Sequence, residues 1–226
     1  MTERDAVILR HSVRAYRDEP IESNLIDELI AFIKEINSQS GLNFSLILNE
    51  KKAFNGFMAK YGRFSGVSNY IAVMGKKDKT FAERAGYFGE KIVIKAQMLG
   101  LNTCWVALTY KKVKSAINIE KNQKLLLVIS LGKGKTQGVN RKSKTIKQVC
   151  KLEKDTPEWF LNGIDLVLRA PTAMNQQKFF FSQKNGVVSA KAGVGFYTKV
   201  DLGIAKYHFE VGAGKENFKW QEELCD

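Results

Sequence analysis

The sequence has 226 residues and a formal net charge of +13, from 36 basic and 23 acidic side chains. Its hydrophobic fraction of 44% is ordinary for a globular protein, so a sizeable core can be buried. No apolar run approaches the roughly 20 residues that a membrane-spanning helix needs, and residues 1–12 lack the apolar region of a signal peptide. We therefore expect a cytoplasmic protein of one large or two small domains, with no membrane partner.

The excess positive charge favours anionic partners, such as nucleic acids or phosphorylated small molecules. The cysteines are odd in number and widely spaced, and with only two histidines they form no metal-binding pattern. We expect a reducing compartment, no metal, packed and inert thiols, and a packing or capping role for the later histidine. These residues are Cys104, Cys150, Cys225, His11 and His208.

Hydrophobic periodicity predicts the elements of the first part of the chain. Residues 21–36 carry apolar side chains at spacings of three and four, which predicts an amphipathic helix. Short apolar runs at 44–48 and 70–74 predict buried strands. A second helix over 82–99 is apolar on most sides, so we expect it to be central, with Gly100 as its carboxy-terminal cap.

The later elements are predicted in the same way, from apolar runs, helical spacing and turn residues. The order helix, loop, strand occurs near 21–48 and again near 157–183, which indicates a weak internal duplication with a shorter second copy. The predicted elements are a strand over 102–108, a strand over 125–131, a basic loop over 132–149, a helix that begins near 156–159, a turn over 170–177, a strand over 178–183 and a short helix over 201–213.

The sequence contains two glycine-rich stretches that resemble nucleotide-binding motifs but lack residues that those motifs require. GKGKT at 132–136 resembles a phosphate-binding loop, but Ile129 stands where the first glycine is required and no helix start follows. GAGKEN lacks the third glycine of a dinucleotide fingerprint, because Asn217 occupies that position. No pair of side chains suggests a nucleophile with its base.

Three weaker stretches remain, and each has a simple structural explanation. RHSVRAY places Arg10, Ser12 and Arg14 at alternate positions, which share one face of an extended segment. That face can be a solvated charge run or a site for phosphate. APTAMNQQ can be an ordinary end of a helix, because Pro171 stops a helix. The basic cluster NRKSK at 140–144 can be a solvated loop.

Taken together, these stretches resemble one family. RHSVRAYRDEPI resembles the amino-terminal signature of nitroreductase-family flavoproteins, Arg-x-Ser-x-Arg-x-Phe/Tyr. GYFGEKIVIKAQMLGLNTCWVAL resembles their central helix and its exit, and LLLVISLGKGK with NRKSKTIKQV resembles their late strand and basic segment. APTAMNQQ resembles their flavin-contacting turn. The resemblance covers nearly the whole chain and implies an α+β nitroreductase-like fold with a mainly antiparallel central sheet flanked by helices.

The position of the turn departs from the family pattern. In ordinary members it follows the first long helix, where this chain reads NSQSGLNFSLIL without a proline. Ordinary members are homodimers whose flavin takes phosphate ligands from one subunit and the turn from the other. This chain resembles the single-chain branch, two fused repeats that mimic the homodimer. Residues 1–150 would carry the phosphate site and 151–226 the turn, giving one FMN per chain and a protein that can function as a monomer.

The resemblance also implies which residues hold the phosphate of FMN. Arg10 and Ser12 would bind the phosphate and the ribityl chain through charge-assisted and hydroxyl hydrogen bonds. His11 would contribute mainly through its backbone. Arg141 and Lys144 would close around the same phosphate from the loop after the late strand.

The remaining implied contacts surround the flavin ring. Arg14 would lie at the pyrimidine edge, where a cation raises the reduction potential, and Arg63 is a looser match for a second cation there. Backbone groups at the end of the predicted strand over 102–108 would contact the ring near N5, and the second-half turn would cover its edge. These residues are Val106, Ala107, Leu108, Pro171, Thr172, Ala173 and Asn175.

The implied function is an FMN-dependent NAD(P)H oxidoreductase that reduces nitroaromatic, quinone or related acceptors by ping-pong two-electron transfer. NADH or NADPH would be the reductant. One alternative is an FMN-binding protein without turnover, in which the flavin is structural or sensing. A more remote one is a basic nucleic-acid-binding protein, which needs aromatic and basic side chains interleaved on a sheet face. FFF at 179–181 is consecutive and better fits a buried strand.

Overall fold

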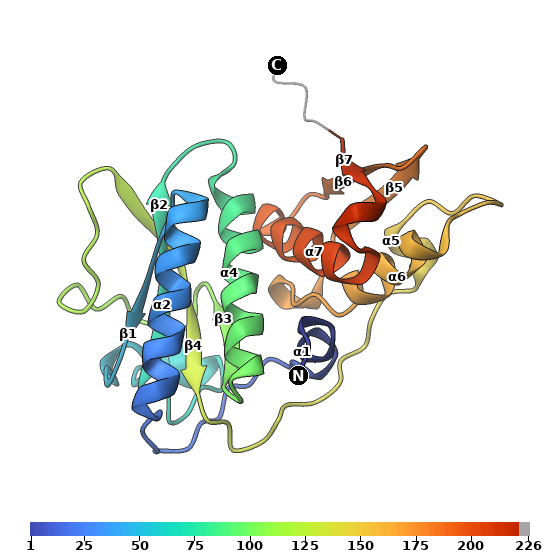
Figure 1. Ribbon diagram of the computed structural model, residues 1–226. Coiled ribbons are helices and arrows are strands. Elements are labelled where there is room, and N and C mark those ends of the chain that lie inside the picture. The colour runs from blue at the N-terminus through green and yellow to red at the C-terminus, as the bar shows by residue number, and fades with distance from the viewer. Residues whose placement is uncertain (222–226) are drawn as a thin grey trace.

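A four-stranded antiparallel sheet forms one side of the molecule in the computed structural model, which describes residues 1–221 (Figure 1). Every pairing in this sheet is antiparallel, which confirms the predicted sheet. The strand predicted over 102–108 ends at Val106, two residues earlier than expected, because the chain bends there. In spatial order the strands are β1 (Asn43–Ile47), β2 (Asn69–Lys76), β4 (Gln123–Gly132) and β3 (Asn102–Val106).

Two long helices pack against one face of this sheet. α2 (Ser23–Ser40) and α4 (Phe81–Met98) share a core with alternate sheet residues, including Ile71 and Ile129. α2 continues about one turn beyond the predicted end at residue 36 and stops where Gly41 adopts a left-handed φ of 64°. Gly100 follows α4 with a φ of 78°, as expected of a residue at that cap.

The opposite face of the sheet is covered by irregular segments. Tyr70, Ala72 and Val128 point into a second core. The segment around Val13, together with η1 (Lys52–Phe54) and α3 (Phe57–Tyr61), closes it. Because strand side chains alternate between faces, both faces of β2 are buried, which explains its continuous apolar sequence.

The second half forms a smaller layer on the other side of α4. β5 and β6 pair antiparallel, and β7 joins β6 in parallel. Phe179 and Phe181 are buried while Phe180 is exposed, so the three phenylalanines alternate as a strand requires. The elements of this layer are α6 (Glu158–Val167), η2 (Ala173–Asn175), β5 (Phe179–Lys184), β6 (Val187–Ala192), η3 (Lys215–Asn217) and β7 (Lys219–Trp220).

α7 (Thr198–Ala213) connects the two layers and lies between α4 and α6 (Figure 1). The predicted helix over 201–213 is present and ends as expected at Ala213, but α7 begins three residues earlier and is buried along most of its length. Its first residue follows Tyr197, which has a left-handed φ of 57° instead of a capping side chain. Nothing in the sequence therefore announces this helix start.

The short helix α3 was also missed, as were two further short helices that carry a capping signal. α1 (Glu3–Leu9) begins with reciprocal hydrogen bonds between Thr2 and Asp5. α5 (Ile146–Val149) lies inside the predicted loop over 132–149 and begins with the same arrangement between Thr145 and Gln148. Within residues 1–221, no helix has the length and apolar character needed to cross a membrane.

Candidate functional site

The segment after α1 is extended and runs beside β3. Ser12 forms an isolated parallel bridge with Thr103, and the Val13 amide donates to the Thr103 carbonyl at 3.0 Å. Val13 is buried in the core, whereas Arg10, Ser12 and Arg14 line one cavity. The alternation in the sequence thus produces a shared face that borders a cavity, which excludes a simple solvated charge run.

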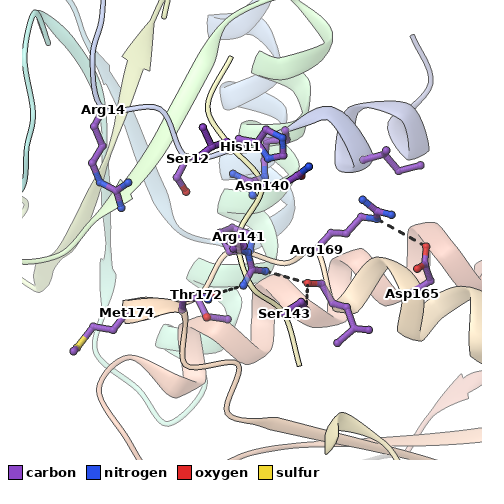
Figure 2. A pocket seen from close by; sticks show the side chains of 16 residues that line it. His11, Ser12, Arg14, Asn140, Arg141, Ser143, Asp165, Arg169, Thr172 and Met174 are labelled. Carbon is purple, nitrogen blue, oxygen red and sulfur yellow. Dashed lines mark hydrogen bonds and ion pairs between the residues drawn. The ribbon is translucent and has the colours of Figure 1, made fainter. Parts of the chain in front are cut away.

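This basic cavity has a volume of about 570 Å³, within the range of small-molecule sites. It is bounded by the end of α1, the loop before α5, the end of α6 and the turn after it (Figure 2). Its cationic lining comes from both halves of the chain. The cationic or potentially cationic residues are Arg10, His11, Arg14, Arg141 and Arg169.

Arg10 is the most buried of these side chains. Only 5% of the residue is exposed, and its Nε has no hydrogen-bond partner among residues 1–221. Its one ion pair joins Nε to Glu90 Oε1 at 3.7 Å, which is too long for a hydrogen bond. A buried guanidinium without such partners is rare, so Arg10 is suited to an anionic ligand in the cavity.

The carboxylate beside Arg10, that of Glu90, belongs to a buried polar network. Glu90 on α4 accepts a hydrogen bond from Trp105 Nε1 at 2.8 Å and contacts His208 Nε2 on α7 at 2.9 Å. Glu90 and His208 are fully buried. His208 therefore has a packing role, as expected, but its partner was not anticipated. The sequence did contain one signal for this partner: Glu90 is an acidic residue within a predicted helix that is apolar on most sides.

Burial and the clustered positive charges change the pKa of His11, which lies between them. Burial, followed by the charges of Arg10, Arg169 and Arg141, lowers the pKa of His11. Burial and the charge of Arg10 also lower the pKa of Arg141 to about 10. Arg141 therefore remains charged at neutral pH. This end of the cavity is strongly positive and favours a multiply charged anion.

A second cavity of about 450 Å³ adjoins the first and is mainly apolar. It is lined by residues 104–109 at the end of β3 and by the beginning of α7. Leu108, Met174 and Phe196 line it and are 68%, 92% and 76% exposed, so its mouth is rimmed by large apolar side chains. The two cavities share the lining residues Ser12, Arg14, Pro171, Thr172 and Met174.

Arg14 and Asp201 are the charged residues of this apolar cavity. The Arg14 guanidinium lies 5.9 Å from the centre of the Phe64 ring. Asp201 on α7 accepts hydrogen bonds from the Ala173 amide at 2.9 Å and from Gln176 Nε2 at 2.7 Å. Burial raises the pKa of Asp201 to about 6. Asp201 thus anchors the turn after α6 to the start of α7.

Most of the residues expected at the flavin site lie together, but two do not. Lys144 lines neither cavity, and its Nζ donates to the Gln177 carbonyl at 2.8 Å. Arg63 is exposed just after α3 and also lies outside both linings, although its neighbours Gly62 and Phe64 border the apolar cavity. The expected residues that line a cavity are Arg10, His11, Ser12, Arg14, Val106, Ala107, Leu108, Arg141, Pro171, Thr172, Ala173 and Asn175.

The cysteines within the described residues are free, buried thiols. Burial raises the pKa of Cys104, which borders the apolar cavity, and raises the pKa of Cys150 to about 11. Both are therefore unreactive thiols at neutral pH. Cys225 lies outside residues 1–221. In that range, no cluster of three or more His, Cys, Asp or Glu residues could hold a metal ion.

Comparison with known protein families assigns this arrangement. Residues 4–213 match the family model described as "Putative TM nitroreductase". The chain belongs to this nitroreductase family. Among curated proteins, none matches the sequence significantly.

Solved structures of nitroreductase-family proteins share the fold. A Thermotoga maritima protein described as a "putative nitroreductase" has a TM-score of 0.68 and 21% identity, over 94% of this chain and 83% of its own. A Parabacteroides distasonis protein described as "Putative NADH dehydrogenase/NAD(P)H nitroreductase" has a TM-score of 0.51 and 20% identity. That match covers 97% of the second protein but 66% of this chain. Part of this nitroreductase-family chain therefore has no counterpart there.

Proposed function

We propose that this protein is an FMN-dependent NAD(P)H oxidoreductase that binds one FMN per chain. The observation that carries the proposal is Arg10, a buried guanidinium whose Nε has no hydrogen-bond partner among residues 1–221, on the wall of a basic cavity that adjoins an apolar one. A flavin mononucleotide has the matching parts, a dianionic phosphate at one end and a flat, largely apolar ring at the other. A neighbouring fold named "FMN-dependent Nitroreductase" is consistent with this cofactor.

The basic cavity would hold the phosphate and the ribityl chain. Arg10 supplies charge-assisted donors for phosphate oxygens, and the Ser12 and Thr172 hydroxyls lie on the shared wall, where ribityl hydroxyls would pass. Arg169 and neutral His11 border the same space. Their charge and polarity favour a dianion over a neutral ligand.

The apolar cavity would hold the ring. Residues 106–108 offer backbone groups on one side, and Pro171 and Ala173 cover the other. Arg14 stands where the two cavities meet. A positive charge at that place favours the reduced ring and raises its potential.

FMN supplies hydride transfer between a nicotinamide and an oxidised acceptor, so the protein needs no acid–base pair of its own. The chain instead provides the space in which both substrates bind in turn. The apolar walls and the exposed rim of Leu108, Met174 and Phe196 suit flat, apolar acceptors such as nitroaromatics and quinones. The same space would admit the nicotinamide of NADH or NADPH, which gives ping-pong kinetics.

Purification and steady-state kinetics test this proposal. We expect a yellow protein that releases one FMN per chain, and NADH or NADPH oxidation that depends on added quinone or nitroaromatic with parallel double-reciprocal plots. FMN bound without turnover for any of these pairs would favour the alternative of a structural or sensing flavin. Protein that neither retains nor binds FMN would contradict the proposal.

A further inference from the structure

The basic loop, defined here as residues 141–144, borders the basic cavity, but its polar groups form hydrogen bonds with residues 168–177 in the second half of the chain. The Arg141 guanidinium donates to three acceptors after α6. These are the carbonyls of Leu168 at 3.1 Å and Ala170 at 2.6 Å, and Asn175 Oδ1. Figure 2 shows Arg141 and Ser143 together on the side of the cavity that carries Thr172, with their hydrogen bonds as dashed lines.

The other residues of the basic loop also form hydrogen bonds with the segment after α6. The Lys144 amide donates to Gln177 Oε1 and its Nζ to the Gln177 carbonyl, both at 2.8 Å. Gln177 Nε2 donates back to Ser143 Oγ at 3.0 Å, and Asn175 Nδ2 donates to the Lys142 carbonyl at 2.8 Å. Loop and turn are therefore joined by reciprocal hydrogen bonds along their length.

The turn, residues 170–177, needs support of this kind. Met174, Asn175 and Gln177 have φ angles of 51°, 55° and 44°, in the left-handed region. None is a glycine, and such residues persist only where their surroundings determine the conformation. The basic loop supplies contacts on one side and Asp201 on the other.

Arg141 and Arg10 differ in the donors that they leave for a ligand. A guanidinium has five N–H donors. Arg141 already uses donors on both terminal nitrogens for protein acceptors, whereas the Nε of Arg10 has no hydrogen-bond partner among residues 1–221. A phosphate entering the cavity would therefore find donors on Arg10, and it would have to displace protein contacts to bind Arg141.

We propose that Arg141 and Lys144 are positioning residues, which hold the turn in the conformation that lines both cavities, and that they are not phosphate ligands. This inference rests on the proposed flavin function. It replaces the role that family resemblance alone suggests for both side chains. Because the turn borders the ribityl and ring space, its displacement weakens binding of any flavin, whether or not the flavin carries a phosphate.

Comparison of FMN with riboflavin, which lacks the phosphate, separates the two roles. Arg141→Ala should weaken both flavins at least 10-fold and leave the ratio of their dissociation constants within about threefold of the wild-type ratio. Arg10→Ala should weaken FMN roughly 10- to 150-fold and riboflavin by less than about threefold. Lys142→Ala, which removes a neighbouring exposed side chain, is the matched control and should leave both affinities unchanged. Quenching of flavin fluorescence measures each constant.

Amide hydrogen exchange of the flavin-free protein gives a second readout that requires no ligand. Exchange over 172–178 should increase in Arg141→Ala and remain at the wild-type level in Arg10→Ala. Arg141→Lys keeps the charge but cannot reach three acceptors, so it should behave like Arg141→Ala even if the alanine variant does not fold.

Two results would overturn the positioning role. The first is loss of FMN affinity alone with wild-type exchange, and the second is no change in either flavin. If the wild type binds neither flavin, the proposed function fails, while the exchange result still decides whether Arg141 holds the turn.

Discussion

Arg10 combines two properties that seldom occur together in a folded protein. It is 5% exposed, and its Nε lacks a hydrogen bond with residues 1–221. Leaving a charged group without partners in the interior is costly, and Glu90 at 3.7 Å compensates for only part of that cost. An anion with several oxygen acceptors would satisfy the remaining donors, so ligand binding and local stability should be coupled at this residue.

Replacing Arg10 with alanine should weaken FMN binding much more than it disturbs the fold. A charge-assisted hydrogen bond contributes ~1.5–3 kcal/mol, so the dissociation constant should rise roughly 10- to 150-fold. Fluorescence titration gives the affinity, and urea unfolding of the flavin-free protein gives the stability. Arg4→Ala removes an exposed arginine of α1 and serves as the control. Wild-type affinity in the Arg10 variant would show that the phosphate lies elsewhere.

Asp201 should make the flavin-free protein less stable as the pH rises. Burial raises its pKa from 3.8 to about 6, against the opposing effect of hydrogen bonds and the charge of Arg141. The folded state thus binds this proton more tightly than the unfolded chain. The resulting stabilisation is complete below about pH 3.8 and is lost as the pH rises through about 6. Over that window it amounts to ~3 kcal/mol at most.

Urea unfolding between pH 4 and pH 8 tests this contribution. Asp201→Asn removes the titration and keeps an oxygen that can accept from the Ala173 amide. We expect the difference in unfolding free energy between wild type and variant to change across the pH window, with the wild type losing relative stability towards pH 8. If the two pH profiles are parallel, the carboxyl does not titrate as its burial predicts.

At the scale of elements, α4 and α7 cross at two glycines with reciprocal surroundings. A Cβ on Gly86 would lie 2.1 Å from the Val200 carbonyl oxygen, and one on Gly203 would lie 2.0 Å from the Glu83 carbonyl oxygen. Each glycine therefore faces the carbonyl three residues before the other glycine. A two-fold axis between paired helices produces the same reciprocity, so this crossing supports the interpretation of two fused repeats.

Alanine at either glycine should force the helices apart and reduce the free energy of unfolding by about 1–3 kcal/mol or more. Because separation caused by one alanine relieves the other, the double variant Gly86→Ala/Gly203→Ala should lose less than the sum of the single changes. Gly56→Ala is the control, since a Cβ there meets nothing within 4 Å. Strict additivity in urea unfolding would show that the two glycines do not share one contact.

α4 and α7 are also joined by the buried contact between Glu90 and His208, and hydrogen-bond chemistry determines how many protons this contact holds. The Leu166 carbonyl can only accept, so His208 Nδ1 carries a hydrogen at 3.0 Å from it. The 2.9 Å contact between His208 Nε2 and Glu90 then requires a second proton between them. Whichever atom holds that proton, the pair as a whole is neutral beside Arg10.

Glu90→Gln should therefore be tolerated far better than Glu90→Ala. A glutamine amide can donate to Nε2 of neutral His208 and accept from Trp105, so we expect a loss of about 1 kcal/mol. Alanine leaves Trp105, His208 and Arg10 without their buried partner and should cost ~3–5 kcal/mol. Urea unfolding measures both losses. Equal losses would mean that the charge of Glu90, and not its hydrogen bonding, is what the interior requires.

Hydrophobic pattern predicted the elements that bury one regular face or lie wholly inside. α2 has its apolar residues at helical spacing, and β2 and β4 are continuous apolar runs with both faces covered. α7 was underestimated because it is buried nearly all round and so has no polar face to mark its period. β6, with only Val188 fully buried, lacks the alternation that identifies a strand.

The candidate site divides in the same way between local and long-range information. The alternation of Arg10, Ser12 and Arg14 is local, so an extended backbone was enough to place them on one face. The buried network of Glu90 joins residues more than a hundred positions apart in the sequence, and a single sequence carries no signal for such contacts. Lys144 could be placed near the turn, but the direction of its side chain depends on Gln177, which no pattern reveals.

At the scale of the whole molecule, one cavity takes its walls from both parts of the chain. Arg10 and Ser12 belong to residues 1–150, whereas Pro171, Thr172 and Asn175 belong to 151–226, and all five line the basic cavity. We propose that a single chain completes its own flavin site, with α4 and α7 in place of a subunit interface. Under this proposal the protein is a pseudo-dimer that can function as a monomer.

Mixing two defective variants tests this interpretation, because size alone does not: a self-sufficient monomer could still associate through an unrelated surface. Arg10→Ala damages the first part of the site, and Asn175→Ala removes a partner of Arg141 in the second. If the turn of one chain completed the cavity of another, mixed particles would contain one intact site, and FMN binding would recover on mixing. We expect no recovery after co-refolding or prolonged incubation, since both variants damage the same basic cavity, which each chain forms from its own residues. Recovered binding would contradict the single-chain arrangement and leave the family assignment intact, because the same residues would then meet between chains.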